Sequence, residues 1–203
     1  MNQELSNEQE SDEALMESVK NGDMTAFDLL VKRYQKPVVN YLYRLTGNFA
    51  LAEDIAQESF LMLYRKAKLF HSAGCFKPWF YKIVTNLCNQ ELRKKKFLFS
   101  HQEIVSDDMI EFQKINSQSP SQKIEEKEIQ SQIRHLINSL PKKQRIAVTL
   151  HIFEEFTYQE IADILNCSIG TVKSRIHYGL QSIKEKAVRM NLLSVRRQQD
   201  EMF

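Results

Sequence analysis

Apolar residues recur every three or four positions through most of the chain, which is the period of a helix that buries one face. The first such stripe predicts a short helix from Asp12 to Lys20, capped by Ser11 and ended by the Asn21-Gly22 turn. A longer helix follows, which we expect Pro37 to kink and Gly47 to end. No alternating pattern typical of strands stands out, so the predicted fold class is all-α.

Two further stripes complete a block of four helices. One runs from Leu51 to about Phe70, and the segment from His71 to Gly74 interrupts the pattern after it. The other begins near Pro78, a residue favoured in a first helical turn, and continues through Leu92. The first of these two helices also carries a polar face, for which contact with solvent is the simplest interpretation: Glu53, Asp54, Gln57 and Glu58.

The composition changes to Ser, Gln, Asp and Asn between about residues 100 and 122, and the helical stripe fades there. This change predicts a flexible linker. Helical periodicity returns at Ile124 and again after Pro141, which predicts a second small helical domain. The expected organisation is a first domain at 11–99, a linker at 100–122, a second domain at 123–190 and a tail at 191–203.

The second domain contains the clearest local motif. Thr157-Tyr158-Gln159-Glu160 is a capping box, in which threonine and glutamate each bond the backbone of the other. The short helix that it starts turns at Asn166-Cys167, and Ser168 can cap a second helix from Ile169 to about Lys186. This predicts a helix-turn-helix for DNA, although a helical hairpin with a solvated basic face has the same caps. Five apolar residues are expected to fasten the two helices together: Ile161, Leu165, Ile169, Val172 and Ile176.

Aromatic and basic residues concentrate in the stretch CFKPWFYKIVTNLCNQELRKKK. The only tryptophan, Trp79, stands beside Phe76, Phe80 and Tyr81, one helix upstream of the basic run at 93–96. One interpretation is a packed core followed by a solvated helix end. The other is a nucleic-acid surface, where rings stack on bases and cations hold phosphates.

Composition and charge exclude several classes of protein. The 203 residues include three cysteines without CxxC spacing and five isolated histidines, so neither a disulfide framework nor a metal site is expected. No apolar run approaches the roughly 20 residues that span a bilayer, and we expect a cytoplasmic protein without membrane insertion. Because no phosphate loop or nucleophile motif is present, we expect no enzyme, no cofactor and no small-molecule substrate. The net charge of +2 hides an acidic N-terminus and basic patches further on.

Residues 140–183, LPKKQRIAVTLHIFEEFTYQEIADILNCSIGTVKSRIHYGLQSI, resemble the C-terminal DNA-binding domain of bacterial sigma-70 family sigma factors, especially the extracytoplasmic-function (ECF) class. Response regulators share this style of helix-turn-helix. They lack two segments of the first block, however. AEDIAQESF at 52–60 resembles the segment by which sigma factors grip RNA polymerase, and WFYKIVTN at 79–86 resembles their promoter-melting segment.

The resemblance implies a four-helix sigma region 2 and a helix-turn-helix sigma region 4 joined by a flexible linker. It implies that the chain binds core RNA polymerase, directs it to promoters through minus-10 and minus-35 elements, and promotes DNA melting. Core polymerase, promoter DNA and an anti-sigma factor are the implied partners. The polar face of the third helix becomes a polymerase contact, carried by Asp54, Gln57 and Glu58.

The resemblance also assigns two DNA surfaces. Trp79 is the first candidate for a wedge at the edge of the melted bubble, whereas Tyr81 is expected in the core and Phe80 fits either place. The implied minus-10 contacts are Phe76, Lys77, Trp79, Lys82, Asn86, Arg93 and Lys94. The implied minus-35 contacts are Thr171, Lys173, Ser174, Arg175, His177 and Tyr178.

The sequence departs from the family pattern at a few positions. The family often has aspartate where Gln90 stands and Arg-Ala where Tyr178-Gly179 stand, so an unusual promoter preference is expected. The linker is too short for the middle domain of housekeeping sigma factors. The rival interpretation is a helix-turn-helix regulator that binds DNA without polymerase and senses a signal through its N-terminal block, and binding to core polymerase distinguishes the two.

Overall fold

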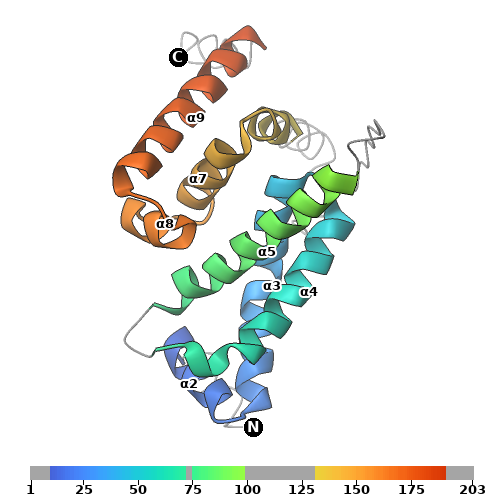
Figure 1. Ribbon diagram of the computed structural model, residues 1–203, viewed down its shortest axis with the longest axis vertical. Helices are drawn as coiled ribbons and strands as arrows, with labels where there is room; N and C mark the ends of the chain where they lie inside the picture. The colour runs from blue at the N-terminus through green and yellow to red at the C-terminus, as the bar shows by residue number, and fades with distance from the viewer. Residues whose placement is uncertain (1–9, 72–74, 99–130, 191–203) are drawn as a thin grey trace, which may run out of the picture.

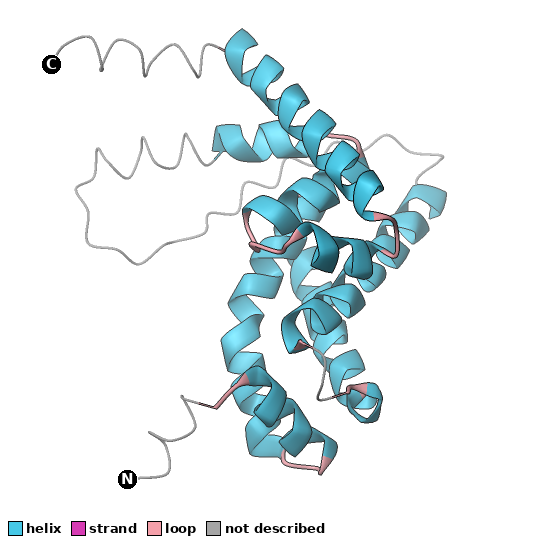
Figure 2. Cartoon of the chain, turned by 90° about the vertical axis from the view of Figure 1, so that its left-hand side faces the viewer, coloured by secondary structure: helices cyan, strands magenta, loops and turns pink. Residues whose placement is uncertain are grey.

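The computed structural model describes residues 10–71, 75–98 and 131–190. Within these ranges the backbone forms helices joined by short loops, and no strand occurs (Figures 1 and 2). The expected linker at 100–122 and tail at 191–203 lie outside the described residues. The all-α prediction is confirmed, and the two helical domains pack directly against one another, an arrangement that local patterns did not predict.

The first domain follows the predicted element order. Ser11 accepts from Ala14 N at the start of its first helix, and Gly47 ends the second helix with a left-handed φ of 69°. The last helix begins at Phe76, two residues before Pro78, where Glu13 Oε1 accepts the Phe76 N–H at 2.9 Å. Its elements are α2 (Asp12–Lys20), α3 (Met24–Thr46), α4 (Phe49–Arg65), the 3-10 turn η1 (Ala67–Leu69) and α5 (Phe76–Leu98).

Helices α3, α4 and α5 of the first domain enclose a core rich in aromatic rings. Phe76 and Phe80 stack with ring centroids 5.7 Å apart, and Tyr34 lies edge-on to both. The hydroxyls of Tyr41 and Thr85 share a buried hydrogen bond of 2.8 Å, which satisfies the two polar groups at low exposure. Phe80 and Tyr81 are fully buried. This confirms the expected core position of Tyr81 and places Phe80, for which either position was expected, in the core as well.

The second domain has a helix-turn-helix at its C-terminal end. The capping box at Thr157 and Glu160 is formed as predicted, and Ser168 accepts from Thr171 N. Asn166 makes the turn with a left-handed φ of 48°, a conformation that asparagine tolerates. The helices are residues 131–138, α7 (Lys142–Ile152), α8 (Tyr158–Leu165) and α9 (Ile169–Arg189).

The prediction that Ile169 packs between the two helices of the helix-turn-helix is wrong. Ile161, Val172 and Ile176 are buried between the helices, and Leu165 is partly buried, but Ile169 is 39% exposed. Ile169 is the first residue of α9, whereas the inward stripe of α9 starts at Val172 and returns one turn later at Ile176. A single exposed isoleucine at a helix start carries little energetic penalty.

The two domains meet in more than one place: Arg145 of α7 donates to the Leu45 carbonyl of α3 at 3.0 Å, and the loop 153–156, between α7 and α8, contacts α3 and α5. Figure 1 shows α8 lying beside α5, and the two helices are in contact. Tyr81 of α5 lies edge-on to Phe156 at 5.0 Å, and the guanidinium of Arg44 in α3 covers the Phe153 ring at 4.3 Å. The buried side chains of both domains consequently form one continuous core.

Glu154 is the buried charge of this contact, with 7% of its surface exposed. The Tyr81 hydroxyl donates to Glu154 Oε2 at 2.6 Å, Arg44 lies 3.6 Å from Oε1, and Lys77 Nζ donates to the Glu154 carbonyl at 2.7 Å. All three partners belong to the first domain. Burial raises the pKa of Glu154, while Tyr81 and the charges of Arg44 and Lys77 oppose that rise and exposed Glu155 adds to it.

The crossing of α7 and α9 depends on Gly179. A Cβ atom there would lie 2.7 Å from Val148 Cγ2. Gly179→Ala is therefore expected to lower the free energy of unfolding by about 1–2 kcal/mol, because overpacking outweighs the gain in helix propensity. In a Val148→Ala background the same change is expected to be stabilising, since the clash is gone. Urea unfolding followed by circular dichroism measures both effects, and a Gly179→Ala protein more stable than the parent contradicts this account.

The raised pKa of Glu154 predicts a pH effect on stability. The folded chain holds the Glu154 proton more tightly than the unfolded chain, whose glutamates have the ordinary value near 4.5. The contribution of Glu154 to stability is therefore greatest below that value and falls as the pH rises through the raised pKa of the folded state. Urea unfolding between about pH 4 and pH 8 should show this decline relative to Glu154→Gln. Glu53→Gln, at an exposed position on α4, should keep the parental dependence, and identical slopes in the Glu154→Gln and Glu53→Gln variants would refute the assignment.

Candidate polymerase and nucleic-acid interfaces

The polar face of α4 is held in place by an ordinary cap and a buried stripe. Asn48 accepts the Leu51 N–H at 2.7 Å, and Ile55 and Ser59 lie on the inner face, where the serine hydroxyl donates to the Ile55 carbonyl. Of the predicted polymerase contacts, Asp54 and Gln57 are exposed, and Glu58 is partly exposed and lies 3.4 Å from Arg65. The structure therefore brings the three residues together on one accessible face.

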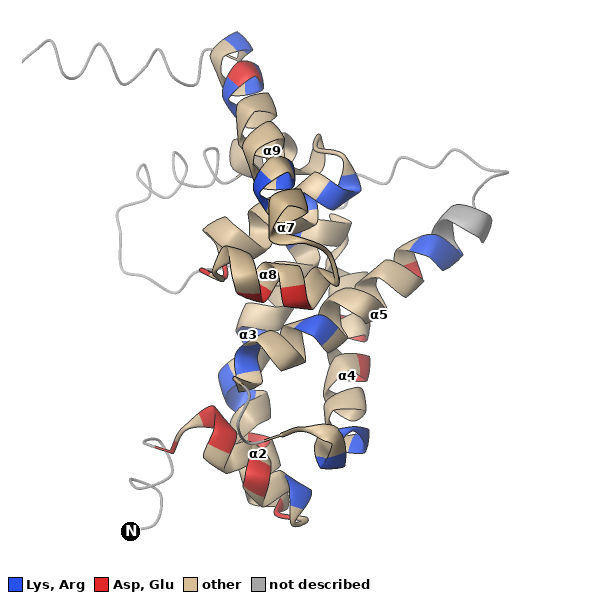
Figure 3. Ribbon diagram, turned by 60° about the vertical axis from the view of Figure 1, so that its left-hand side comes forward, with Lys and Arg blue, Asp and Glu red and all other residues tan. Residues whose placement is uncertain are grey.

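This face borders a shallow groove between α4 and α5 of about 140 Å³. Asp54 and Glu58 line one side of it, and Leu87 and Glu91 of α5 line the other. Glu91 was not predicted as part of the site, because its place beside α4 depends on a contact between helices. Figure 3 shows acidic segments on α4 and basic segments on α5 and α9. Three carboxylates around a partly apolar groove fit a partner that presents basic and apolar side chains.

The predicted minus-10 residues divide between two flanks of α5. At about 100° per residue, Trp79, Lys82, Asn86 and Arg93 fall within roughly 60° of one another on the helix. Lys82, Asn86 and Arg93 are exposed, as is Lys94, which pairs with Glu91 at 2.6 Å. A line of cations and an amide along one exposed face can bond phosphates and base edges.

Trp79 lies at the buried edge of this face. Its ring is partly buried, edge-on to Phe70 at 5.3 Å and tilted against Phe76 at 6.3 Å. Phe76 is completely buried and cannot itself reach DNA in this arrangement; it supports the tryptophan instead. A ring fixed by two neighbours loses little further freedom when it stacks on a base.

Lys77 lies on the opposite flank of α5. Besides its bond to the Glu154 carbonyl, its ammonium lies 4.8 Å from the centroid of the Phe156 ring and 6.0 Å from that of Tyr81. Sequence reasoning placed Lys77 on the minus-10 surface but missed its partners, because Glu154 and Phe156 are more than 70 residues away and carry no local signal.

The predicted minus-35 residues gather on α9, with different accessibilities. Thr171 is partly buried and shares a 2.9 Å hydrogen bond with Ser168, and Arg175 is partly buried beside Cys167 at 3.5 Å. The side chains of these two residues bond groups at the start of α9 and are therefore less available to DNA than the exposed residues of the set. The exposed set is Lys173, Ser174, His177 and Tyr178. Ammonium, hydroxyl, imidazole and phenol groups on one helix face can bond phosphates and base edges in a major groove.

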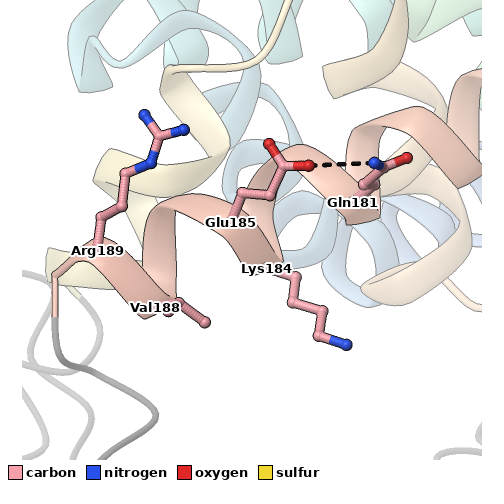
Figure 4. Close-up of a pocket in the computed structure, with 5 residues that line it drawn as sticks. All are labelled: Gln181, Lys184, Glu185, Val188 and Arg189. Carbon is pink, nitrogen blue, oxygen red and sulfur yellow. Dashed lines mark hydrogen bonds between the residues drawn. The ribbon is translucent and has the colours of Figure 1, made fainter.

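A hollow of about 450 Å³ lies along the C-terminal half of α9 (Figure 4). All of its lining residues come from this one helix, and Gln181 donates to Glu185 at 3.1 Å. Because no second element faces them, the hollow is open surface rather than a ligand pocket. Among the described residues no group of His, Cys, Asp and Glu is arranged to hold a metal ion. None of the helices in these ranges has the length and apolarity needed to cross a bilayer.

The helical arrangement is shared with solved structures. CnrH, in complex with the cytosolic domain of CnrY, superposes with a TM-score of 0.67 at 16% identity, covering 89% of this chain and 99% of that one. The sigma factor RpoE from Bartonella quintana, in complex with the anti-sigma factor NepR, gives a TM-score of 0.65 at 22% identity, covering 78% of this chain and 94% of that one. At these identities the likeness shows the fold.

Sequence comparisons identify the family. Residues 30–97 match Sigma-70 region 2, and residues 130–192 match Sigma-70, region 4. The RNA polymerase sigma-H factor of Pseudomonas aeruginosa is 32% identical over 179 residues, covering 86% of this chain and 93% of its own length. The ECF RNA polymerase sigma factor SigW of Bacillus subtilis is 33% identical over 184 residues, covering 84% and 94%. The chain therefore belongs to the ECF class of sigma-70 family RNA polymerase sigma factors.

Proposed function

We propose that this sigma factor binds core RNA polymerase through the acidic face of α4, reads the minus-10 element with α5 and reads the minus-35 element with α9. The observation that carries the proposal is the placement of exposed charge on different helices, with Asp54 on α4, Lys82 on α5 and Lys173 on α9. Figure 3 shows acidic segments on α4 and basic segments on α5 and α9. Each face suits one kind of partner: a basic protein surface for α4, and the DNA backbone for α5 and α9. The domain limits 11–99 and 123–190 remain part of this proposal.

Promoter opening by this chain requires binding rather than bond-making. Unstacking a base costs a few kcal/mol, and one base–aromatic stack returns roughly 1–3 kcal/mol. Trp79, supported by Phe70 and Phe76, is the ring placed to supply such a stack. The nearby cations Lys82 and Arg93 would hold the phosphates of the separated strand and the adjoining duplex. We therefore propose no catalytic residue in this chain.

An anti-sigma factor is the third proposed partner. The RpoE structure that this fold resembles is a complex with an anti-sigma factor, and CnrH was solved with the cytosolic domain of CnrY. By analogy we propose that a protein inhibitor binds this chain inside the cell, where core polymerase and promoter DNA are found.

In vitro transcription tests the proposed function. Core polymerase with this chain is expected to start transcripts at promoters that share two sequence elements, when genomic fragments serve as template. The double variant Asp54→Arg and Glu58→Arg should weaken core binding roughly tenfold or more, because it presents like charge to a basic partner. Asp28→Arg, with Asp28 exposed on α3, is the control for a charge reversal elsewhere on region 2. Core binding that the double variant leaves unchanged would refute the α4 contact, whereas absence of core binding by the parent chain would argue for the rival regulator.

The proposed stacking role of Trp79 is tested separately, by measuring how far the promoter DNA is melted. Trp79→Ala is expected to reduce the permanganate reactivity of promoter thymines in the open complex, by roughly 5- to 150-fold in the opening equilibrium if one stack is lost. Core binding should stay close to that of the parent. Trp79→Phe keeps a smaller ring against Phe70 and should fall between the two. Full thymine reactivity with Trp79→Ala would exclude the wedge.

A further inference from the structure

The helix that carries Trp79 has its first turn held by a side chain from much earlier in the chain. Glu13 Oε1 accepts the Phe76 N–H at 2.9 Å, although the two residues are 63 positions apart. Glu13 belongs to α2, which precedes residues 30–97, the part of the chain that matches Sigma-70 region 2. The start of α5 therefore depends on a residue outside that match.

The first turn of α5 has few local means of satisfying its backbone. The opening N–H groups of a helix lack an intrahelical acceptor, and Cys75, the residue before α5, is not of the Ser, Thr, Asp or Asn type that caps them best. Pro78 has no N–H, which removes one of the free donors. Glu13 accepts the Phe76 donor, and its negative charge also suits the positive end of the α5 dipole.

Helix α2 can support α5 because it is itself fixed to the core. It contacts α3, α5 and η1. Its buried residues are Leu15, Met16 and Val19. The Asp12 carboxylate, next to Glu13, accepts from the Tyr34 hydroxyl, and the Tyr34 ring lies edge-on to Phe76 at 5.3 Å. Two adjacent carboxylates of α2 consequently fix Phe76, one through its backbone and the other through the ring beside it.

Phe76 connects this support to Trp79. The two rings lie 6.3 Å apart, and both contact Phe70, at 6.1 Å and 5.3 Å. Phe70 and Phe76 are buried, whereas Trp79 is partly exposed, so Trp79 is the ring of this cluster with surface available to a base. A first turn that moves would lower the fraction of chains whose ring is ready to stack, and binding falls in proportion to that fraction.

We propose that Glu13 is a positioning residue for promoter melting, which fixes the first turn of α5 so that the Trp79 ring is held ready to stack on an unpaired base. This role rests on the proposed function of Trp79 as the stacking ring. Glu13 is partly buried and negatively charged, so direct contact with DNA phosphates is unfavourable. It acts on DNA only through the Phe76 N–H and the rings that follow.

Two substitutions of Glu13 separate its hydrogen bond from its charge. Glu13→Gln keeps an oxygen that can accept the Phe76 N–H, whereas Glu13→Ala has none, and both remove the same charge from the start of α2. Alanine favours a helix at least as well as glutamine, so Glu13→Ala does not weaken α2 itself more than Glu13→Gln does. Glu17→Ala is the control for loss of a glutamate elsewhere on α2, where Glu17 pairs with Lys20 at 2.8 Å.

Fluorescence of the free chain gives a readout that needs no DNA, because Trp79 is the only tryptophan. Glu13→Ala is expected to raise the acrylamide quenching of Trp79 and to lower its anisotropy, while Glu13→Gln and Glu17→Ala stay close to the parent. Circular dichroism of all four proteins should be alike, since one helical turn is affected. Equal quenching in the two Glu13 variants overturns the proposal. A general loss of helix in Glu13→Ala would assign Glu13 to the folding of region 2 and would also overturn it.

Promoter opening then tests the consequence for DNA, with core polymerase and a promoter mapped by in vitro transcription. Glu13→Ala is expected to lower the opening equilibrium, read from the permanganate reactivity of thymines, by roughly 2- to 30-fold relative to Glu13→Gln, the range for a lost helix cap. Core binding should be the same in both. In a Trp79→Ala background the difference between the two Glu13 variants should vanish, because the ring through which Glu13 acts is gone. A difference that persists there overturns the proposal.

The outcomes separate this inference from the proposed function. Reduced opening with Trp79→Ala but parental opening with Glu13→Ala overturns the role of Glu13 and leaves the stacking role of Trp79 standing. Full opening with Trp79→Ala excludes the stack itself, and with it the role of Glu13 in melting.

Discussion

The Tyr81 side chain joins the two halves of this molecule. Its ring packs against Tyr41 at 5.2 Å inside region 2 and against Phe156 at 5.0 Å from region 4, and its hydroxyl donates to Glu154. Complete burial of this side chain therefore depends on both domains being present and in contact. The loop 153–156 supplies both the ring and the carboxylate that complete the surroundings of Tyr81.

Charge separates the surfaces that this arrangement leaves accessible. The chain has a net charge of only +2, but acidic groups gather beside the α4 groove, and basic groups extend along α5 and α9 (Figure 3). A nearly neutral chain with opposed local fields can approach a basic protein surface and DNA at different helices. The interdomain contact involves α3 and α5 and leaves Asp54 of α4 and Lys173 of α9 exposed. Lys77 is the proposed DNA contact that bonds the other domain.

Local features of the fold could be predicted from the sequence because their causes are local. Caps at Ser11, Thr157 and Ser168 and the stop at Gly47 each depend on residues within a few positions, and all four are formed. The exposure of Ile169 was missed because an apolar stripe does not show where the inward face of a helix begins. For the candidate sites, the sequence placed the exposed residues of α4 and α9 on common faces. It could not reveal features that depend on contacts between helices. These are the burial of Phe76, the position of Glu91 beside the groove, and the bond between Lys77 and a carbonyl 77 residues away.

The central claim is that the two domains of the free chain pack against each other around Tyr81. Spin labels at Lys36→Cys on α3 and Asp163→Cys on α8, both exposed positions, report the distance between the domains by pulsed electron resonance. Cys75 and Cys167 are replaced by serine, and buried Cys88 is left in place. The account predicts one short, narrow distance for the free chain and a broader distribution for Glu154→Arg, which removes the acceptor of the Tyr81 hydroxyl. A broad distribution of distances in the parent chain would contradict it.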